Sequence, residues 1–425
     1  MARALWNLTE NCIIVLPFRV GSEYVDHVTS TLKIDPELVK IVVADSLLWD
    51  EVLTSGAMWE SIESARRELG GEIVNVEPCF HTAGVVQLRT KILGGMPGSS
   101  DAFLAEGGAD FFNRKVLFRK LAASQGIPLP EGKIVPDADA LYGAVHGLLP
   151  ITGTVIIKRD NAGGGLGNFA ITSDFERPIQ GVSRGYLDKN PSREFLDSLH
   201  AEMCSLGSSE LIVEAYHASS SAFFFEYFID STGAVLFVQS YEMKHRAPAG
   251  SADWWRTDWI GLEMPADLPP EKYAEARRYS ERLFKLAADL GYRGYLHLDG
   301  IYLSDGRLMF NETNARWSGG TVLHKIGARV LGPEYRKSFL SSYRLLPAVP
   351  GSTLYPRIKD GPLAFSRTSA DGNIAVVCDP EGVSETEILV VGQTRTSVVE
   401  GEASLIRYFS NFGGGPSGEK SSVDF

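Results

Sequence analysis

Residues 295–316 read YLHLDGIYLSDGRLMFNETNAR, and they are the most informative stretch of this 425-residue chain. Asp305-Gly306 is typical of a two-residue hairpin loop. That loop predicts two antiparallel strands in which Asp299 faces Glu312 and His297 faces Asn314. Because side chains alternate between the faces of a strand, all four lie on one face. The same face is predicted to carry, nearer the loop, the apolar side chains of Ile301, Leu303, Leu308 and Phe310.

Two carboxylates oppose each other in this hairpin. Directly opposed side chains have Cβ atoms about 4.5–5.5 Å apart, so Asp299 and Glu312 repel each other. A divalent cation relieves that repulsion, because Mg²⁺ takes oxygen ligands from one or two carboxylates and completes its shell with phosphates and water. Asp299, Glu312 and Asn314 are therefore candidate metal ligands. The alternative is an exposed polar face in which one carboxylate is solvated or protonated.

A second pattern joins a lysine-bearing strand to a glycine-rich loop. Residues 154–159 are predicted to form an apolar strand that contains Lys158, and the loop after it contains Gly163, Gly164, Gly165 and Gly167. Glycines let backbone N–H groups approach an anion closely. Because neither the Walker ending nor a helix follows, the pattern favours a strand–loop–strand flap over phosphates. The alternative is a plain hairpin loop, in which glycine is common.

Composition excludes several classes of protein. The chain has 41 Lys and Arg against 53 Asp and Glu, a net charge of −12, which argues against nucleic acid as a partner. The longest apolar stretch near the N-terminus, residues 12–18, is far short of the roughly 20 residues that span a membrane. Four scattered cysteines fit neither a metal site nor a disulfide framework. We therefore expect a cytoplasmic protein with reduced thiols.

The N-terminal part alternates strand and helix patterns. Strands are predicted at 11–18, 39–44 and 72–76, with a helix at 50–69. This alternation predicts an open α/β domain over residues 1–104.

The rest of the chain is predicted to have three further parts. Residues 105–345 form a central domain with subdomains at 105–213 and 214–345. A small C-terminal α+β domain is predicted at 346–412, with short strands at 374–378, 387–391 and 394–399. Residues 413–425 are rich in Gly and Ser and are expected to form a flexible tail.

The order of these pieces resembles the ATP-grasp superfamily, in particular its carboxylate–amine ligases. The resemblance covers residues 105–345, and residues 1–104 resemble the Rossmann-like pre-grasp domain. It implies a fold of the α/β and α+β classes that binds ATP and Mg²⁺, with two ions expected and Mn²⁺ as a substitute. Lys115 and Lys158 match the two nucleotide-binding lysines. The backbone of the adenine hinge is matched by Glu214, Ala215 and Tyr216.

The resemblance implies that the hairpin at 295–316 carries the metal ligands and the residues next to the reacting groups. Asp299, Glu312 and Asn314 match the Mg²⁺ ligands, and Arg316 matches the arginine that faces the transferred phosphate or acyl group. His297 stands where some families, the D-alanine ligases among them, have an arginine. Arg316 and His297 are therefore the candidate catalytic residues.

A narrower resemblance comes from residues 314–321, which read NARWSGGT, and from the added C-terminal part. Both look most like the pheganomycin-type peptide ligases of antibiotic biosynthesis. These join the carboxylate of a guanidino-bearing, nonproteinogenic amino acid to the N-terminal amine of a peptide. The expected reaction proceeds through an acyl phosphate and yields an amide, ADP and phosphate, as in the biosynthesis of peptide natural products.

Two segments are candidates for binding substrate. Residues 242–259 combine three tryptophans with cations, and predict a lid that contributes Lys244, Arg246 and Arg256. The alternative is a solvated loop anchored by tryptophans in a core. Ser318, Gly319 and Gly320 offer backbone N–H groups to an acyl oxygen, or else begin a helix.

The expected partners are a small carboxylate substrate and a peptide amine, with neither nucleic acid nor membrane. Three alternatives stay open from the sequence: a ligase for a small amine acceptor, a carboxyl kinase that releases a phosphorylated product, and a nucleotide-binding module without turnover. The oligomeric state is also open, with a homodimer as one expectation.

Overall fold

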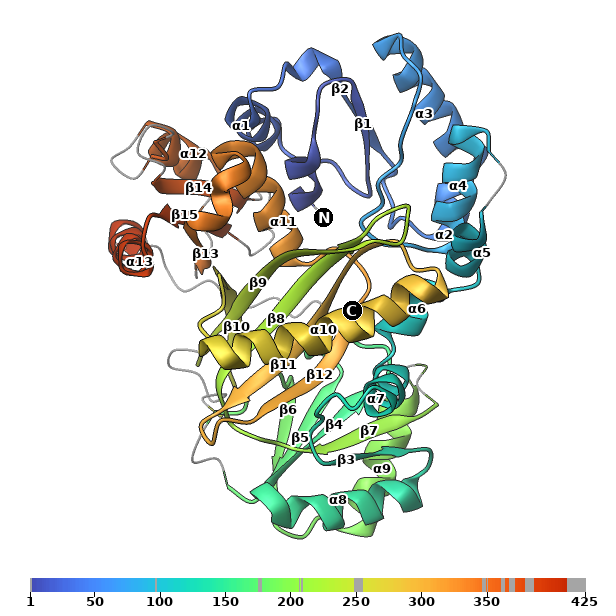
Figure 1. Cartoon of the computed structure of the whole chain (residues 1–425), viewed down its shortest axis with the longest axis vertical. Coiled ribbons are helices and arrows are strands. Elements are labelled where there is room, and N and C mark those ends of the chain that lie inside the picture. The colour runs from blue at the N-terminus through green and yellow to red at the C-terminus, as the bar shows by residue number, and fades with distance from the viewer. Residues whose placement is uncertain are drawn as a thin grey trace.

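A computed structural model describes residues 2–95, 98–174, 178–205, 207, 209–247, 255–345, 349, 351–360, 364–366, 371–378 and 386–410. The described chain contains sheets of two, five and eight strands (Figure 1). The five-stranded and eight-stranded sheets carry the predicted site residues. None of the helices in these residues is long and apolar enough to cross a membrane. The thiols of Cys12, Cys79 and Cys204 are free.

The N-terminal part is built on two parallel strands, β1 (Cys12–Leu16) and β2 (Val39–Val43). Its helical elements are η1 (Ala2–Asn7), α1 (Ser22–Leu32), η2 (Pro36–Leu38), α2 (Asp50–Leu53), α3 (Gly56–Leu69), α4 (Ala83–Leu93) and α5 (Ser99–Ala105).

Two sequence predictions for this part are wrong. The helix predicted at 50–69 is split in two, because Ser55 caps α3 through its hydroxyl, which accepts a hydrogen bond from the N–H of Met58 at 3.1 Å. Residues 72–76 form no strand in the structure. Val74 is 89% exposed, so this stretch lacks the buried neighbours that a strand of an α/β sheet needs.

The five-stranded sheet forms one half of the central region. Helices α6 (Gly108–Asn113) and α7 (Lys115–Ser124) lead into it, and α8 (Ala138–Thr152) and α9 (Arg193–Ser205) pack on one face through an apolar core. Its strands, in spatial order, are β3 (Gly132–Val135), β7 (Leu211–Ala215), β4 (Thr154–Arg159), β5 (Asn168–Thr172) and β6 (Arg184–Leu187).

The eight-stranded sheet forms the other half. The amphipathic pattern predicts a helix at 270–290, and α10 (Pro270–Leu290) confirms it, packed across one face of the sheet (Figure 1). The spatial order is β12 (Leu308–Asn314), β11 (Gly294–Leu303), β8 (Ser219–Ile229), β9 (Val235–Arg246), β10 (Asp258–Met264), β13 (Phe339–Leu345), β15 (Thr386–Gly392) and β14 (Gly372–Cys378).

The N-terminal and C-terminal segments pack together on the opposite face of this sheet. Residues from η1 and α1 share one apolar core with the C-terminal elements. The helical elements on this side are α11 (Gly319–Ile326), η3 (Gly327–Leu331), η4 (Pro333–Lys337), α12 (Gly351–Asp360) and α13 (Arg395–Ser410).

The C-terminal part continues the large sheet. β13 pairs with β15, so hydrogen bonds cross the boundary predicted at residue 345. That division stays a prediction. The strand predicted at 394–399 is wrong, because these residues begin α13, where Ser397 Oγ accepts a hydrogen bond from Thr394 N–H at 3.1 Å. The predicted tail at 413–425 lies outside the described residues.

Candidate active site

The hairpin of β11 and β12 has the predicted pairing where it matters for the site. His297 pairs with Asn314, and Asp299 pairs with Glu312. A bulge then shifts the register, so that Gly300 pairs with Phe310. The shift turns Phe310, and Leu308 with it, into the core under α10. The prediction that these two side chains share the face of Asp299 is therefore wrong.

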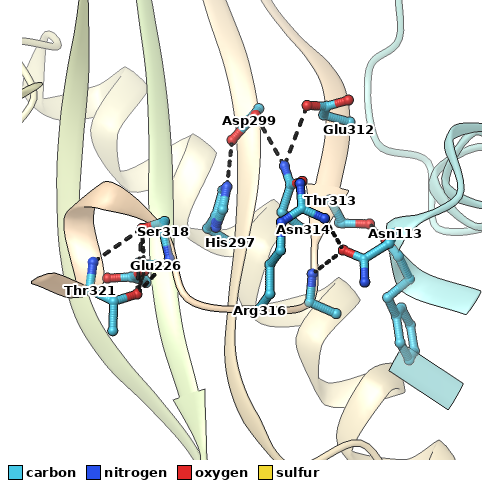
Figure 2. A network of polar contacts seen from close by, with 12 residues as sticks. Asn113, Glu226, His297, Asp299, Glu312, Thr313, Asn314, Arg316, Ser318 and Thr321 are labelled. Atoms are coloured by element: carbon cyan, nitrogen blue, oxygen red, sulfur yellow. Dashed lines mark hydrogen bonds and ion pairs between the residues drawn. The ribbon is translucent and has the colours of Figure 1, made fainter. Parts of the chain in front are cut away.

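Burial and repulsion set the charges of the two carboxylates (Figure 2). Burial, and then the facing Glu312, raise the pKa of Asp299 well above its ordinary value. Burial also raises the pKa of Glu312, but the ammonium groups of Lys115 and Lys158 outweigh it and bring that pKa to about 2. Asn314 Nδ2 lies 3.3 Å from Asp299 Oδ2 and 3.4 Å from Glu312 Oε1, where it bridges the pair.

The donor set fits a hard divalent cation. Asp299 Oδ1 is a buried oxygen that accepts no hydrogen bond from the described residues, although His297 Nε2 lies 3.4 Å from it, so it retains a ligand position. Among those residues, no three His, Cys, Asp or Glu side chains gather as a metal site. Asn314 turns its amide nitrogen to this pair and its amide oxygen to Arg316, so its role as a metal ligand stays a prediction. A cation held by Asp299 and Glu312 would therefore need further oxygen ligands, which is how Mg²⁺ binds together with phosphates.

Two buried lysines lie next to these carboxylates. Lys115, the first residue of α7, forms an ion pair of 2.6 Å with Glu312 and donates to the carbonyl of Ala162. Lys158 on β4 forms an ion pair of 2.6 Å with Glu214, which also pairs with Arg119 at 2.7 Å. Lys115 thus contacts the carboxylate pair directly, and the binding of phosphate oxygens by the two ammonium groups stays a prediction.

The glycine-rich loop connects β4 to β5. Gly164 and Gly165 have φ of +62° and +77°, a conformation that favours glycine. A Cβ atom on Gly163 would lie 3.2 Å from the guanidinium of Arg316, so the loop passes close to that arginine. At Gly167 an added Cβ would collide with Ala162 at 2.2 Å. The loop is therefore closely packed at Gly163 and Gly167, and its contact with phosphates stays a prediction.

The predicted adenine hinge lies at the end of β7. The N–H of Ala215 donates to Glu131 O at 2.8 Å, and the N–H of Tyr216 donates to Thr154 O at 2.9 Å. These two groups are engaged within the protein, so adenine recognition by them stays a prediction. The Tyr216 ring packs with Trp255 against an apolar cluster made of Ile156, Ala170, Ile179 and Val182. The local sequence does not mark this cluster, because its members come from separate segments of the chain.

Arg316 borders a cavity of about 590 Å³. Its Nη1 donates to Asn113 Oδ1 at 3.0 Å, and its Nη2 donates to Asn314 Oδ1 at 2.6 Å (Figure 2). The guanidinium is thereby fixed beside a predicted metal ligand. The cavity is lined by Phe80, Asp110, Asn113, Arg114, Lys115, Asp160, Asn161, Ala162, Gly163, Gly207, Ser209, Asn314 and Arg316.

His297 is unsuited to the role of a cation. Its side chain is buried against the ring of Phe224, with ring centroids 4.8 Å apart. Burial, and then the charge of Arg316, lower the pKa of His297 to about 3. The imidazole is therefore neutral at physiological pH, which leaves Arg316 as the cation of the predicted catalytic pair.

The predicted substrate-binding cations lie away from this cavity. Lys244 donates to Ser341 Oγ at 2.8 Å and pairs with Glu402 of α13. Arg246 donates to the Tyr343 hydroxyl at 2.6 Å, and Arg256 pairs with Asp258. None of the three cations lines the cavity. Part of the predicted lid, residues 248–254, lies outside the described residues.

Ser318, Gly319 and Gly320 begin α11. Ser318 Oγ accepts a hydrogen bond from the N–H of Thr321 at 3.1 Å, which is a helix cap. The Tyr241 hydroxyl donates to the carbonyl of Gly320 at 2.8 Å. Of the two interpretations left open by the sequence, the structure displays the helix start, and contact with an acyl oxygen stays a prediction.

Comparisons with known proteins agree with this architecture. Residues 1–92 match the family model described as Pre ATP-grasp domain. An ADP complex of N5-carboxyaminoimidazole ribonucleotide synthetase has a TM-score of 0.58 at 12% identity, with 96% of this chain and 94% of that chain covered. The same enzyme from Thermus thermophilus has a TM-score of 0.56 at 14% identity, with 96% and 95% covered.

A carboxylase domain has the same architecture. The biotin carboxylase domain of Hydrogenobacter thermophilus 2-oxoglutarate carboxylase has a TM-score of 0.56 at 13% identity, with 93% of this chain and 90% of that chain covered. No curated protein sequence matches the chain. The chain therefore has the ATP-grasp fold, with a pre-ATP-grasp domain at its N-terminus.

Proposed function

We propose that this protein is an ATP-dependent carbon–nitrogen ligase that releases ADP and phosphate. The observation that carries the proposal is the opposed pair Asp299 and Glu312, bridged by Asn314 and flanked by Lys115. Two facing buried carboxylates are costly unless a cation binds between them. The similar structures support a nucleotide as the accompanying ligand, since two of them are complexes with ADP and one of these includes its magnesium salt.

The proposed chemistry follows from the low reactivity of a carboxylate toward amines. It is a poor acyl electrophile until the γ-phosphoryl group of ATP converts it to an acyl phosphate, and catalysis of that transfer is mainly positioning and charge neutralisation. Lys115, Lys158 and the glycine loop would hold the phosphates. Mg²⁺, when bound to the hairpin, supplies charge neutralisation at the transferred group. Arg316 would stabilise the tetrahedral oxyanion formed when the amine attacks.

We further propose an amino-acid carboxylate and a peptide amine as the two substrates, in a cytoplasmic enzyme of peptide natural-product biosynthesis. The acid would be a guanidino-bearing, nonproteinogenic amino acid. Support comes from the NARWSGGT ending at 314–321 and from a cavity of about 590 Å³ beside Arg316, which has room for more than a phosphate group.

The test measures ADP and phosphate release from Mg²⁺-ATP with a pool of amino acids, with and without short peptides. We expect release to need both a free carboxylate and a peptide amine. Glu312→Gln should lower it by at least about 100-fold, since even outer-shell changes at metal sites cost 10- to 100-fold. The control Glu334→Gln changes an exposed carboxylate of η4 and should match wild type.

Other results would revise the proposal. Release with amino acids alone would indicate a small amine acceptor. A stable phosphorylated product without amide would indicate a carboxyl kinase. Absence of release with every mixture, together with calorimetric binding of ATP, would indicate a nucleotide-binding module.

A further inference from the structure

The cavity beside Arg316 lies at one end of the predicted nucleotide site. Lys115 and Asn314 line it, whereas Lys158 and Tyr216 do not. In the predicted binding mode, Tyr216 marks the adenine end and Asn314 marks the metal and the terminal phosphate. The cavity is therefore the space beyond the phosphates, where an acid and an amine would meet.

Two carboxylates line this cavity, and they differ in their surroundings. Asp160 is 3% exposed, pairs with Arg114 at 2.6 Å and accepts a hydrogen bond from the N–H of Val116 at 2.8 Å, so its charge is used within the fold. Asp110 is exposed, and its carboxylate has neither a hydrogen bond nor an ion pair with the described residues. Asp110 is thus the carboxylate of the cavity that is available to a ligand.

Asp110 is also close to the reacting end of the site. It lies one helical turn before Asn113 on α6, so the two side chains share a face of the helix. Asn113 Oδ1 accepts the hydrogen bond of 3.0 Å from Arg316 Nη1. Partial burial and the nearby Asp50 raise the pKa of Asp110, while Arg114 and Arg316 oppose this rise. A cationic ligand at Asp110 would favour its charged form.

An aromatic ring completes this wall of the cavity. Phe80, from the N-terminal part, forms an antiparallel bridge with Arg316 and lines the same cavity as Asp110. A carboxylate together with an aromatic face is a suitable environment for an ammonium group.

Resting on the proposed function, we propose that Asp110 binds the ammonium group of the amine substrate and accepts its proton. The proton passes from nitrogen to the Asp110 carboxylate, and the freed lone pair attacks the acyl phosphate carbon. The C–N bond forms and the C–O bond to phosphate breaks, with its electron pair leaving on phosphate. The second proton of the amine leaves with phosphate or water.

The test measures binding of the amine substrate separately from formation of the acyl phosphate. Wild type, Asp110→Asn, Asp110→Glu and the control Glu106→Gln are assayed with Mg²⁺-ATP and the amino-acid pool, using either trialanine or hydroxylamine as the nucleophile. Glu106 is exposed and does not line the cavity. Hydroxylamine is neutral at pH 7.5, so hydroxamate formation reports acyl phosphate without needing an ammonium site.

We expect Asp110→Asn to form hydroxamate at the wild-type rate but to raise the KM for trialanine at least tenfold, with partial rescue in Asp110→Glu. An unchanged KM and kcat for trialanine, beside normal hydroxamate formation, would overturn this inference alone. A raised KM for ATP in Asp110→Asn would also overturn it, because the residue would then serve the nucleotide. Absence of hydroxamate in wild type would overturn the proposed function itself.

Discussion

Glu226 is a fully buried carboxyl on β8, paired across the sheet with His297. Its Oε1 accepts hydrogen bonds from Ser318 Oγ at 2.6 Å and Thr321 Oγ1 at 2.5 Å (Figure 2). Its Oε2 has no hydrogen-bond partner among the described residues. Since Ser318 follows Arg316 by two residues, Glu226 anchors the chain directly after this predicted catalytic arginine.

Burial raises the pKa of Glu226 from 4.5 to about 7. Between these values the folded state binds a proton that the unfolded chain has lost, so stability falls as the pH rises through this window. The loss amounts to about 3 kcal/mol if the shift is fully expressed. We expect Glu226→Gln to flatten this part of the profile of unfolding free energy against pH, measured by urea denaturation. Glu106→Gln should keep the wild-type slope, and an equally steep slope in Glu226→Gln would contradict the assignment.

The contacts of the candidate site that the sequence predicts correctly are those fixed by short-range rules. Strand periodicity brings Asp299 and Glu312 together across one hairpin, and the structure confirms that pairing. Nothing in the local sequence marks Asp110, because only tertiary folding brings α6 to the cavity of Arg316. Composition predicts Lys244 as a substrate ligand, but it does not predict the ion pair of Lys244 with Glu402, a residue far along the chain.

At the scale of elements, the bulge in the β11–β12 hairpin depends on Gly300. A Cβ atom there would lie 2.8 Å from the Phe223 ring and 3.0 Å from the Phe310 ring. We expect Gly300→Ala to destabilise the protein by roughly 1–3 kcal/mol, because packed cores resist added methyl groups. Urea denaturation measures the change.

Gly143→Ala is the matched control for Gly300→Ala, and we expect it to change the free energy of unfolding in the opposite direction. An added Cβ at Gly143, in the middle of α8, meets nothing within 4 Å. Gly143→Ala should therefore stabilise the protein by about 0.5–1 kcal/mol, as alanine does in helix interiors. Equal effects of the two substitutions would show that the bulge does not need a glycine.

Elements whose signals agree at several levels were predicted well. Helix α10 has its predicted bounds because an apolar stripe, a proline at its start and Gly291 in the left-handed conformation at its end coincide. The strand predicted at 394–399 rests on Val398 and Val399, which favour strands. The helix start instead depends on two reciprocal hydrogen bonds, from Ser397 N–H to Thr394 Oγ1 and from Thr394 N–H to Ser397 Oγ. The two-residue loop predicted from Asp305-Gly306 does not foresee the bulge at Gly300, because Tyr302 pairs with Leu308.

At the scale of the whole molecule, the two ends of the chain form one core. Trp6 Nε1 donates to Val376 O at 2.8 Å, and the Tyr24 hydroxyl donates to the same carbonyl at 2.6 Å. Arg3 pairs with Glu387 at 2.5 Å. The shared core contains apolar residues from Leu5 onward, together with side chains as late as Phe409.

We therefore expect a chain that ends at residue 345 to fail to fold cooperatively, because the N-terminal segment would expose its half of this core. Dye binding to exposed apolar surface and loss of a single thermal transition would report the failure. A chain that ends at residue 412 keeps every described element and should unfold as the full chain does. Cooperative unfolding of the 1–345 chain would instead support the predicted domain division.

The shared core also fixes the order in which the protein can fold during its synthesis. Ile34 belongs to the same core as Phe409. The first strand and helix can therefore complete their packing only after the last helix has left the ribosome. At about 5–20 residues per second, this wait lasts roughly 20–80 s. For that time the nascent N-terminal segment presents apolar surface that has no intramolecular partner yet, and it is therefore expected to be a substrate for chaperones that bind growing chains.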